Sequence, residues 1–302
     1  MRFSIDDQNS GKTVRDFLRL QGVSAALLAR LKRREDGILQ NGKRVTVRAV
    51  LSAGDVLTLA VEDAAPFEKL QPLAVPVEVL LETEDYLAVN KPPFMPTHPS
   101  HGHFTDTLAN ALVYRYREAP FRPRFVNRLD RNTSGVVLVA KNAYRAAGLS
   151  RAMAEGKMEK EYIAVVCGTI SAETVLKTGI RRRQESIIFR EVCATDEGEL
   201  AITEVFPLCT ANGHTLVRLL PKTGRTHQLR VQLADIGAPI LGDTLYGTEA
   251  ALIGRHALHA QRLSFPAPVG EGNIGVFAPV PADMRAVILE IFGEEGIRLA
   301  EQ

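Results

Sequence analysis

The sequence predicts an α+β protein: a large domain built on a mixed, largely antiparallel sheet, preceded by a small helical domain with a hairpin. Three observations support this prediction. The predicted strands outnumber the predicted helices and are not strictly interleaved with them, unlike the pattern of a doubly wound fold. The pairs Asn41-Gly42 and Asn212-Gly213 indicate turns between paired strands. Residues 136–139 are an apolar run directly after a turn rich in Asn, Ser, Thr and Gly, which is typical of a buried strand.

The length and composition suit one large domain and one small domain. The chain has 302 residues, of which 45% are hydrophobic and 24% charged, so it has ample apolar material for a core. We place the small domain at residues 1–62 and the large domain at 76–302. Residues 63–75 contain two prolines, Pro66 and Pro72, and are predicted to be a linker.

The small domain is predicted to contain two helices and a hairpin. The first helix runs from Lys12 to Gly22, and glycine ends it. Ser24 caps the second helix, whose leucines face inward and whose basic residues face outward. Asn41-Gly42 then joins two short strands.

The small domain is strongly basic although the whole chain has a net charge of only +2. Residues 11–48 hold ten Lys or Arg against three Asp or Glu, a net charge of +7, so the remainder sums to −5. A solvated helix face is the alternative, but a block of this size is typical of phosphate-backbone binding. The helix, helix, hairpin unit resembles the S-four-type (α-L) RNA-binding domain. The resemblance implies that the following side chains contact phosphates: Lys12, Arg15, Arg33, Arg34, Lys43 and Arg44.

The large domain begins with two predicted short strands between Val77 and Val89, around Glu84-Asp85, and an irregular proline-rich loop follows. Helices are predicted over 105–117, with Asp106 in the first turn, and over 143–155. Strands are predicted over 205–208 and 215–220. Thr226 is predicted to cap a helix that Gly237 ends, and a last helix is predicted from Pro281 to Phe292.

The loop Asn127–Gly135 carries one aspartate, Asp130, between Arg128 and Arg131. A carboxylate between guanidinium groups stays ionised at neutral pH, so Asp130 is a candidate nucleophile or base and not a general acid. The alternative is an ordinary Asp–Arg ion pair that fixes the loop, and spacing alone favours that alternative.

Two further segments change this balance. Lys160–Gly168 is a predicted strand with Lys160 and Tyr162 on one face, and Lys222–Leu233 contains the string Gly-Arg-Thr-His-Gln-Leu-Arg. With the Asp130 loop, these segments resemble the RluA-type family of RNA pseudouridine synthases, over about residues 82–281. Supporting matches are Asn90-Lys91-Pro92-Pro93, Pro239–Asp243 with Tyr246-Gly247, and Leu258–Pro266. Asn127 stands where the family usually has histidine.

The resemblance implies a pseudouridine synthase fold and the isomerisation of uridine to pseudouridine in RNA without a cofactor. It implies that Asp130 is the catalytic carboxylate, that Tyr162 stacks on uracil, and that Arg230 pairs with the carboxylate. Arg128 would fill the space of the flipped nucleotide, and we also expect Arg131 and Arg225 to contact RNA. The expected partner is ribosomal RNA, with transfer RNA as the alternative, and we expect a cytoplasmic monomer. A non-catalytic RNA-binding or ribosome-assembly protein is the alternative function.

Other functional classes have little support. No stretch reaches the roughly 18 apolar residues of a membrane span, and residues 1–7 lack the apolar core of a secretory signal. The three cysteines form no Cys-x-x-Cys pair, so we expect reduced thiols. No nucleotide-binding glycine motif is present. The histidines at 98, 101 and 103 would suit a metal hydrolase only with further ligands, which the sequence does not offer nearby, so no metal site is expected. The cluster Arg181-Arg182-Arg183 is predicted to be a surface loop, where RNA contact and simple solvation are both open.

Overall fold

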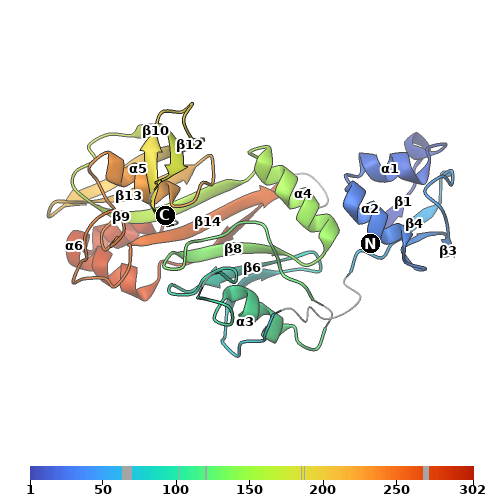
Figure 1. The fold of residues 1–302 in the computed structure, drawn as a ribbon, viewed down its shortest axis with the longest axis horizontal. Coiled ribbons are helices and arrows are strands. Elements are labelled where there is room, and N and C mark those ends of the chain that lie inside the picture. Colours follow the sequence, from blue (N-terminus) through green and yellow to red (C-terminus); the bar gives the residue numbers. More distant parts are fainter. Residues whose placement is uncertain (63–69, 101, 120, 185, 187, 268–271) are drawn as a thin grey trace.

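One mixed sheet organises the larger part of the chain in the computed structural model, which describes residues 1–302 except 63–69, 101, 120, 185, 187 and 268–271 (Figure 1). In the described residues this sheet has eleven strands in the order β11-β10-β12-β13-β9-β14-β8-β6-β5, with β15 beside β14 and β7 beside β8. Its pairs are antiparallel except for β14 and β8, which run parallel. The predicted α+β class and the mixed, largely antiparallel sheet are therefore confirmed.

The strands of this sheet are β5 (Glu78–Glu82), β6 (Tyr86–Lys91), β7 (Arg124–Phe125), β8 (Ser134–Ala140), β9 (Glu159–Cys167), β10 (Thr174–Arg182), β11 (Arg190–Cys193), β12 (Glu199–Ala211), β13 (His214–Pro221), β14 (Leu258–Pro266) and β15 (Asn273–Phe277). The helices are α3 (Leu108–Arg115), α4 (Ala143–Ala154), α5 (Gln228–Asp235) and α6 (Ala282–Ala300).

Strands β6 and β8 are buried on both faces, which explains the continuous apolar run in β8. Alternate residues of a strand point to opposite faces. On one face of β8, Leu138 and the residues two positions before and after it pack in a cluster with Leu149 of α4. On the other face, Val137 and Val139 pack in a cluster with Leu108 and Leu112 of α3. The two helices thus cover opposite faces of this part of the sheet. Helix α6 packs on the other half of the sheet, in a cluster that includes Leu233 of α5.

Gly135 is needed where β8 runs beside β14. Its φ is +118°, and a Cβ at this position would lie 2.1 Å from the backbone oxygen of Ala260. Only glycine allows this approach. The glycine therefore fixes the exit of the Asp130 loop into the parallel β8–β14 contact.

The N-terminal part has its own sheet and core. Its elements are β1 (Arg2–Ser4), a short 3-10 helix (Asp7–Asn9), α1 (Val14–Leu20), α2 (Ala25–Lys32), β2 (Ile38–Gln40), β3 (Lys43–Arg44) and β4 (Val56–Leu59), with strand order β1-β4-β2-β3. Ser24 caps α2, and Asn41-Gly42, both with positive φ, closes the β2–β3 hairpin, as predicted. The core runs from Ile5 to Val61.

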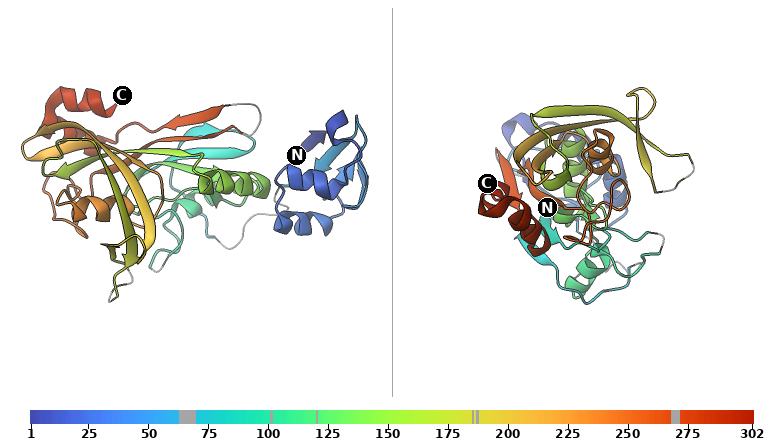
Figure 2. Two further views of the ribbon diagram at one scale, coloured as in Figure 1. Left: turned by 90° about the horizontal axis from the view of Figure 1, so that it is seen from above. Right: turned by 90° about the vertical axis from the view of Figure 1, so that its left-hand side faces the viewer.

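Helix α4 contacts the N-terminal part through its side chains, and it lies between that part and the large sheet in two views (Figures 1 and 2). The Tyr144 hydroxyl donates to the carbonyl of Gln21 at 2.7 Å, and Arg151 donates to the carbonyl of Gly22 at 3.1 Å. Tyr144 also packs against the N-terminal core. Much of the predicted linker, residues 63–69, lies outside the described residues.

Three local predictions outside the Asp130 site were wrong. Helix α3 begins at Leu108 because Thr107 caps it, so Asp106 lies before the helix and pairs with His103 instead. Arg181 and Arg182 are in strand β10 and not in a loop, because β11 pairs with this charged end. Helix α6 continues past Phe292 to Ala300, through non-helical backbone at Gly293. No helix in the described part of the chain is long and apolar enough to cross a membrane.

Candidate active site

The first half of the Asp130 loop, residues 127–133, is fixed by side-chain hydrogen bonds to the backbone. The Asn127 side chain donates to the carbonyl of Val136 at 3.0 Å and accepts from the amide of Leu138 at 2.8 Å. These two hydrogen bonds attach the start of the loop to the backbone of β8. The Thr97 hydroxyl donates to the carbonyl of Leu129 at 3.0 Å and accepts its amide at 3.2 Å. The loop therefore holds Asp130 on a rigid frame, which precise positioning of a reacting group requires.

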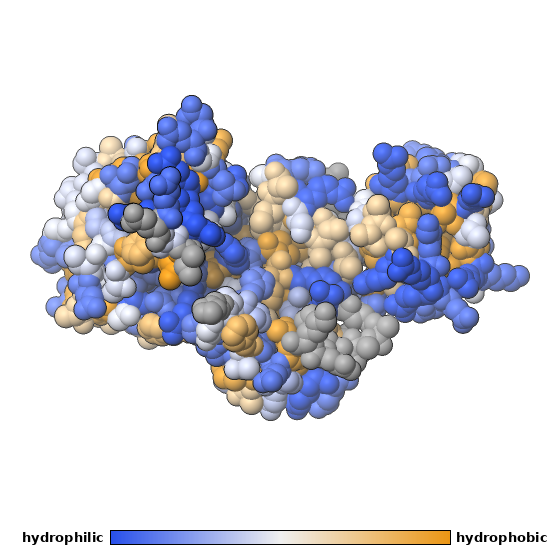
Figure 3. All heavy atoms as spheres, in the orientation of Figure 1, coloured by the Kyte–Doolittle hydropathy of each residue, from blue (hydrophilic) through white to orange (hydrophobic). Residues whose placement is uncertain are grey.

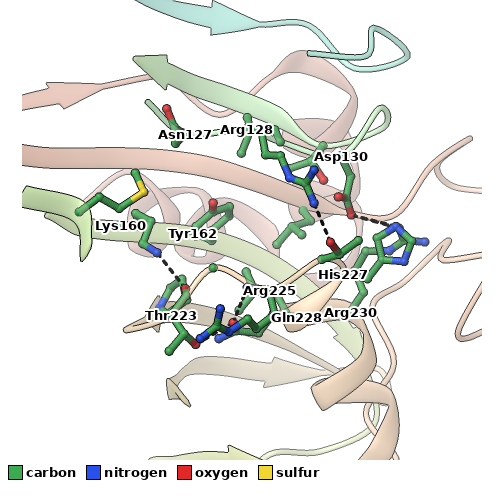
Figure 4. Close-up of a pocket in the computed structure, with 18 of the residues that line it drawn as sticks. Asn127, Arg128, Asp130, Lys160, Tyr162, Thr223, Arg225, His227, Gln228 and Arg230 are labelled. Carbon is green, nitrogen blue, oxygen red and sulfur yellow. Dashed lines mark hydrogen bonds and ion pairs between the residues drawn. The ribbon is translucent and has the colours of Figure 1, made fainter. Parts of the chain in front are cut away.

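Asp130 faces Arg230 from α5, across 100 residues of sequence (Figure 4). Arg230 Nη1 donates to Asp130 Oδ2 at 3.1 Å, and the Asp130 side chain is 29% exposed. Arg230 is itself held by Asp243, a fully buried carboxylate that accepts two bonds of 2.7 Å from Nε and Nη2. The guanidinium is thus oriented by one carboxylate and presents its remaining edge to the other.

Asp130 is ionised at neutral pH. Burial alone would raise its pKa, but His227 and His256, when they are protonated, and the permanent charge of Arg230 outweigh burial and lower it. Burial also lowers the pKa of His227, and it lowers that of His256 to about 3, so both imidazoles are mainly neutral at neutral pH. Arg230 is therefore the permanent cation that keeps the carboxylate charged.

A cavity of about 270 Å³ opens in front of Asp130 and is lined by Tyr162 and Lys160 of β9, which share one face as predicted (Figure 4). Burial and the nearby Asp130 raise the pKa of Tyr162, so its hydroxyl stays protonated. The Lys160 ammonium donates to the carbonyl of Thr223 at 2.8 Å, and burial lowers its pKa to about 8. The cavity lining thus combines one carboxylate, one tyrosine ring and several cations: Arg128, Lys160, Arg225 and Arg230.

The start of α5 shapes the opposite wall. Thr226 was predicted to cap this helix, but His227 takes the cap position with φ +58° and makes no side-chain cap bond. Thr226 accepts a hydrogen bond from Arg128 at 2.6 Å instead. His227 Nε2 lies 3.9 Å from Asp130 Oδ2, and its Nδ1 lies 2.9 Å from the hydroxyl of Tyr246. Since that hydroxyl already accepts the amide of Arg190, it is free to donate to Nδ1, which leaves the imidazole proton on the side of Asp130.

Two buried cations hold the Asp130 loop from behind. The Lys91 ammonium donates to the carbonyl of Arg131 at 3.1 Å, and burial lowers its pKa to about 7. Arg255 donates to the carbonyl of Asn132 at 3.1 Å and is paired with Asp283 at the start of α6. These contacts give the loop carbonyls of Arg131 and Asn132 their hydrogen-bond partners.

The predicted RNA-contacting residues lie in two places. In the large part, Arg128 and Arg131 are exposed beside Asp130, while Arg225 lines the cavity and pairs with Glu199 at 3.5 Å. In the N-terminal part, Lys12 bonds to Asn9, and Arg34 is paired with Asp36 at 2.8 Å. The other four are exposed and without an ion pair in the described part of the chain: Arg15, Arg33, Lys43 and Arg44. Hydrophilic side chains are prominent on the face of the N-terminal part that Figure 3 shows.

The residues that support Asp130 from behind had no separate signal in the sequence. Asp243, Tyr246 and Lys91 stood out only as parts of matching strings, and Arg255 and His256 did not stand out at all. A fully buried acid 13 residues after a buried arginine could have suggested a pair, but only the fold shows both as buried.

Within the described residues, no group of three or more His, Cys, Asp or Glu side chains is arranged to hold a metal ion. His103 pairs with Asp106, the ring of His98 packs edge-on against Phe125, and His101 lies outside the described residues. The three cysteines are free thiols.

Comparisons with known proteins agree on one family. The family model described as RNA pseudouridylate synthase matches residues 85–235. The chain is 38% identical over 279 residues to the Bacillus subtilis (strain 168) protein named "Uncharacterized RNA pseudouridine synthase YjbO", covering 91% of this chain and 98% of the relative. It is 31% identical to "Ribosomal large subunit pseudouridine synthase D" of Vibrio cholerae, covering 89% and 87%. The solved structure of "Human RNA Pseudouridylate Synthase Domain Containing 1" matches with a TM-score of 0.57 and 26% identity, over 71% of this chain and 89% of the other.

Proposed function

Since the chain belongs to the RNA pseudouridine synthase family, an enzyme family that isomerises uridine within RNA, we propose that Asp130 is the carboxylate that acts on the target ribose. One observation carries the proposal. Asp130 lies in the cavity that Tyr162 lines, and it is held ionised by an arginine that a second, buried carboxylate orients. A structural ion pair that only fixed the loop would not need this second carboxylate or an open cavity in front of it.

The reaction requires one bond to break and one to form at the ribose. The bond from C1′ to N1 of uracil breaks, the base turns, and C1′ bonds to C5. The proton on C5 is then lost and N1 carries a proton, so no oxidant, reductant or water is consumed. Asp130 either attacks the sugar or removes a proton from it, and in both cases its negative charge stabilises positive charge that develops on the ribose.

We assign the other residues by their position around Asp130. Arg230 keeps Asp130 ionised and fixed. Tyr162 provides a wall on which the freed uracil stacks, with a protonated hydroxyl available for proton transfer. Arg128, exposed at the cavity mouth and bonded to Thr226, takes the space that the flipped nucleotide leaves. Arg131 and Arg225 contact the RNA backbone.

The proposed substrate is ribosomal RNA. The name of the Vibrio cholerae relative, a ribosomal large-subunit pseudouridine synthase, supports this choice. We further propose that residues 1–62 are an RNA-binding domain that adds backbone affinity, because their exposed basic residues lack ion-pair partners among the described residues. The enzyme is proposed to act as a monomer in the cytoplasm, where ribosomal RNA is modified, since one chain supplies all the cavity residues named above.

Asp130→Asn tests the assignment. The substitution is nearly isosteric but removes the charge, so tritium release from RNA labelled at C5 of uracil should fall to background while RNA binding persists. The loss of one charged hydrogen bond with Arg230 should cost about 1–3 kcal/mol of stability. Asp196→Asn, exposed between β11 and β12, is the matched control. Pseudouridine formation by folded Asp130→Asn protein would refute the assignment, and loss of activity in both variants would not support it.

A further inference from the structure

Phe94 combines two unfavourable properties. Its φ is +64°, in the left-handed region that bulky residues rarely adopt. Its side chain is 52% exposed, so packing does not compensate for the backbone conformation. Such outliers persist only where surrounding structure imposes them, and they cluster at ligand-binding sites.

The buried ammonium of Lys91 bridges the backbone on both sides of Phe94. It donates to the carbonyls of Pro92 at 2.9 Å and Met95 at 2.8 Å, which lie on either side of Phe94 in the chain. The same ammonium donates to the carbonyl of Arg131 in the Asp130 loop at 3.1 Å. The turn that carries the Phe94 ring is therefore tied directly to the loop that carries Asp130.

The segment that follows Phe94 is also tied to the Asp130 loop and exposes a second ring. Thr97 makes two hydrogen bonds to the backbone of Leu129. Seven residues further on, Phe104 is 65% exposed, more than any other phenylalanine among the described residues. Two exposed phenylalanines on one short segment beside a catalytic loop are unlike ordinary scattered surface residues.

The Asp130 loop, to which this segment is tied, also carries two exposed cations. Arg128 and Arg131 are exposed on the Asp130 loop, and neither is paired with a carboxylate among the described residues. Arg128 is close enough to His98 to affect its titration, and Arg131 is close enough to Asp106. The one acid in this part of the segment, Asp106, is already paired with His103. Exposed aromatic rings beside unpaired cations suit single-stranded nucleic acid, whose bases stack and whose phosphates are negative.

We propose that Phe94 and Phe104 form a stacking platform for the unpaired bases of the substrate RNA that flank the target uridine. The proposal rests on the proposed function, since it places the target uridine at Asp130. Lys91 then has a defined role, because it holds the Phe94 turn in its left-handed conformation in register with the Asp130 loop. The platform contributes affinity that does not depend on phosphate contacts.

Phe94→Gly is a clean test because glycine adopts a φ of +64° without strain. The variant should unfold at a temperature no lower than the wild type. Its affinity for a short fluorescein-labelled oligouridylate, measured by anisotropy, should fall by about 5- to 150-fold, the range of one lost base–aromatic stack. Phe104→Ala should show a loss in the same range, and Phe94→Tyr should retain wild-type affinity.

Salt dependence separates stacking from charge. Because no phosphate contact is removed, the slope of log affinity against log salt should be unchanged in Phe94→Gly, whereas Arg131→Gln should reduce it by about 0.7. The matched control is Phe277→Ala in β15, an exposed phenylalanine away from the Asp130 loop, which should bind as the wild type.

Wild-type affinity in both Phe94→Gly and Phe104→Ala would overturn the proposal. A reduced salt slope in Phe94→Gly, or a change in self-association with unchanged RNA affinity, would overturn it too. These readouts are binding measurements, so they are independent of the activity test on Asp130. Activity retained by Asp130→Asn would refute the catalytic assignment, whatever Phe94 does in binding.

Discussion

Asp243 is predicted to control both stability and catalysis, although it lies behind Arg230. Its side chain is fully buried, and its oxygens accept two bonds of 2.7 Å from Arg230. One oxygen also accepts the amides of Leu245 and Tyr246, at 3.0 and 3.3 Å. In Asp243→Asn one acceptor becomes an NH2 group that faces the guanidinium, and the buried cation loses half of its compensating charge.

The magnitude follows from burial. Breaking a buried ion pair costs about 3–5 kcal/mol, and we expect the lower end because Arg230 keeps Asp130 as a partner. Urea unfolding at neutral pH should therefore show a loss of about 3 kcal/mol. A guanidinium that is no longer oriented shifts Asp130, and a displacement of 1 Å can cost about 10²-fold in rate. We expect kcat to fall by about this factor with KM little changed, because Asp243 is not among the residues that line the cavity.

The control is the same chemical change in an exposed pair. Glu204 and Lys222 lie 2.8 Å apart with side chains 32% and 51% exposed, so Glu204→Gln should cost about 0–1 kcal/mol and leave kcat unchanged. If Asp243→Asn and Glu204→Gln lose the same free energy of unfolding, burial does not make the Asp243–Arg230 pair more costly to break than an exposed pair. A stability loss without a change in kcat would show that Asp243 supports the fold but does not position Asp130.

Three further outcomes are expected. Tyr162→Phe should keep RNA binding and fold but lose turnover, because the ring still stacks and only the hydroxyl is gone; wild-type turnover would leave stacking as its only role. Burial lowers the pKa of His259 to about 4 from 6.5, so the unfolded chain binds more protons between these values and stability falls as pH falls from 6.5 toward 4. Between these pH values the free energy of unfolding should fall by about 3 kcal/mol because of His259 alone. Urea unfolding of His259→Gln should not show this part of the pH dependence. Replacing four exposed basic residues of the N-terminal part by Gln should reduce the slope of log RNA affinity against log salt by up to about 0.7–0.9 per lost contact. Turnover at saturating RNA should be retained. An unchanged slope would mean that this part does not bind the RNA backbone. These four are Arg15, Arg33, Lys43 and Arg44.

The features that the sequence predicted well depend on local patterns. Asn41-Gly42 specifies a two-residue hairpin because both residues tolerate positive φ, and the structure has both with positive φ. The run 136–139 is a strand because alternate residues meet separate clusters on its two faces. Ser24 caps α2 by accepting the amide three residues later.

The features that the sequence missed depend on tertiary contacts. The capping preference of Thr226 is local, but Arg128, 98 residues earlier in the chain, takes its hydroxyl, and His227 adopts the left-handed cap position instead. The charged end of β10 is extended because β11 supplies Glu191 opposite Arg181, a pairing that no local propensity encodes. Asp243 belongs to one of the strings that match the family, but nothing in that string predicts its pairing with Arg230, which only the fold brings about.

The charge balance around Asp130 explains why the site uses three charged residues where a simple ion pair has two. A lone Asp130–Arg230 pair would be neutral, and the arginine would be free to bind the carboxylate through two bonds and occupy both oxygens. Asp243 takes two of the guanidinium's bonds, so Arg230 offers Asp130 one bond at 3.1 Å. Two carboxylates around one cation leave a net charge of −1, and the neighbouring imidazoles of His227 and His256 are kept mainly neutral by burial. Within this cluster of three charged residues, the negative charge that faces the cavity is that of Asp130, the only one of the two carboxylates that lines it. If Asp130 is the catalytic carboxylate, as we propose, a ribose that becomes positive as its bond to uracil breaks meets a negative charge that is already in place, so the site does not have to reorganise during the reaction.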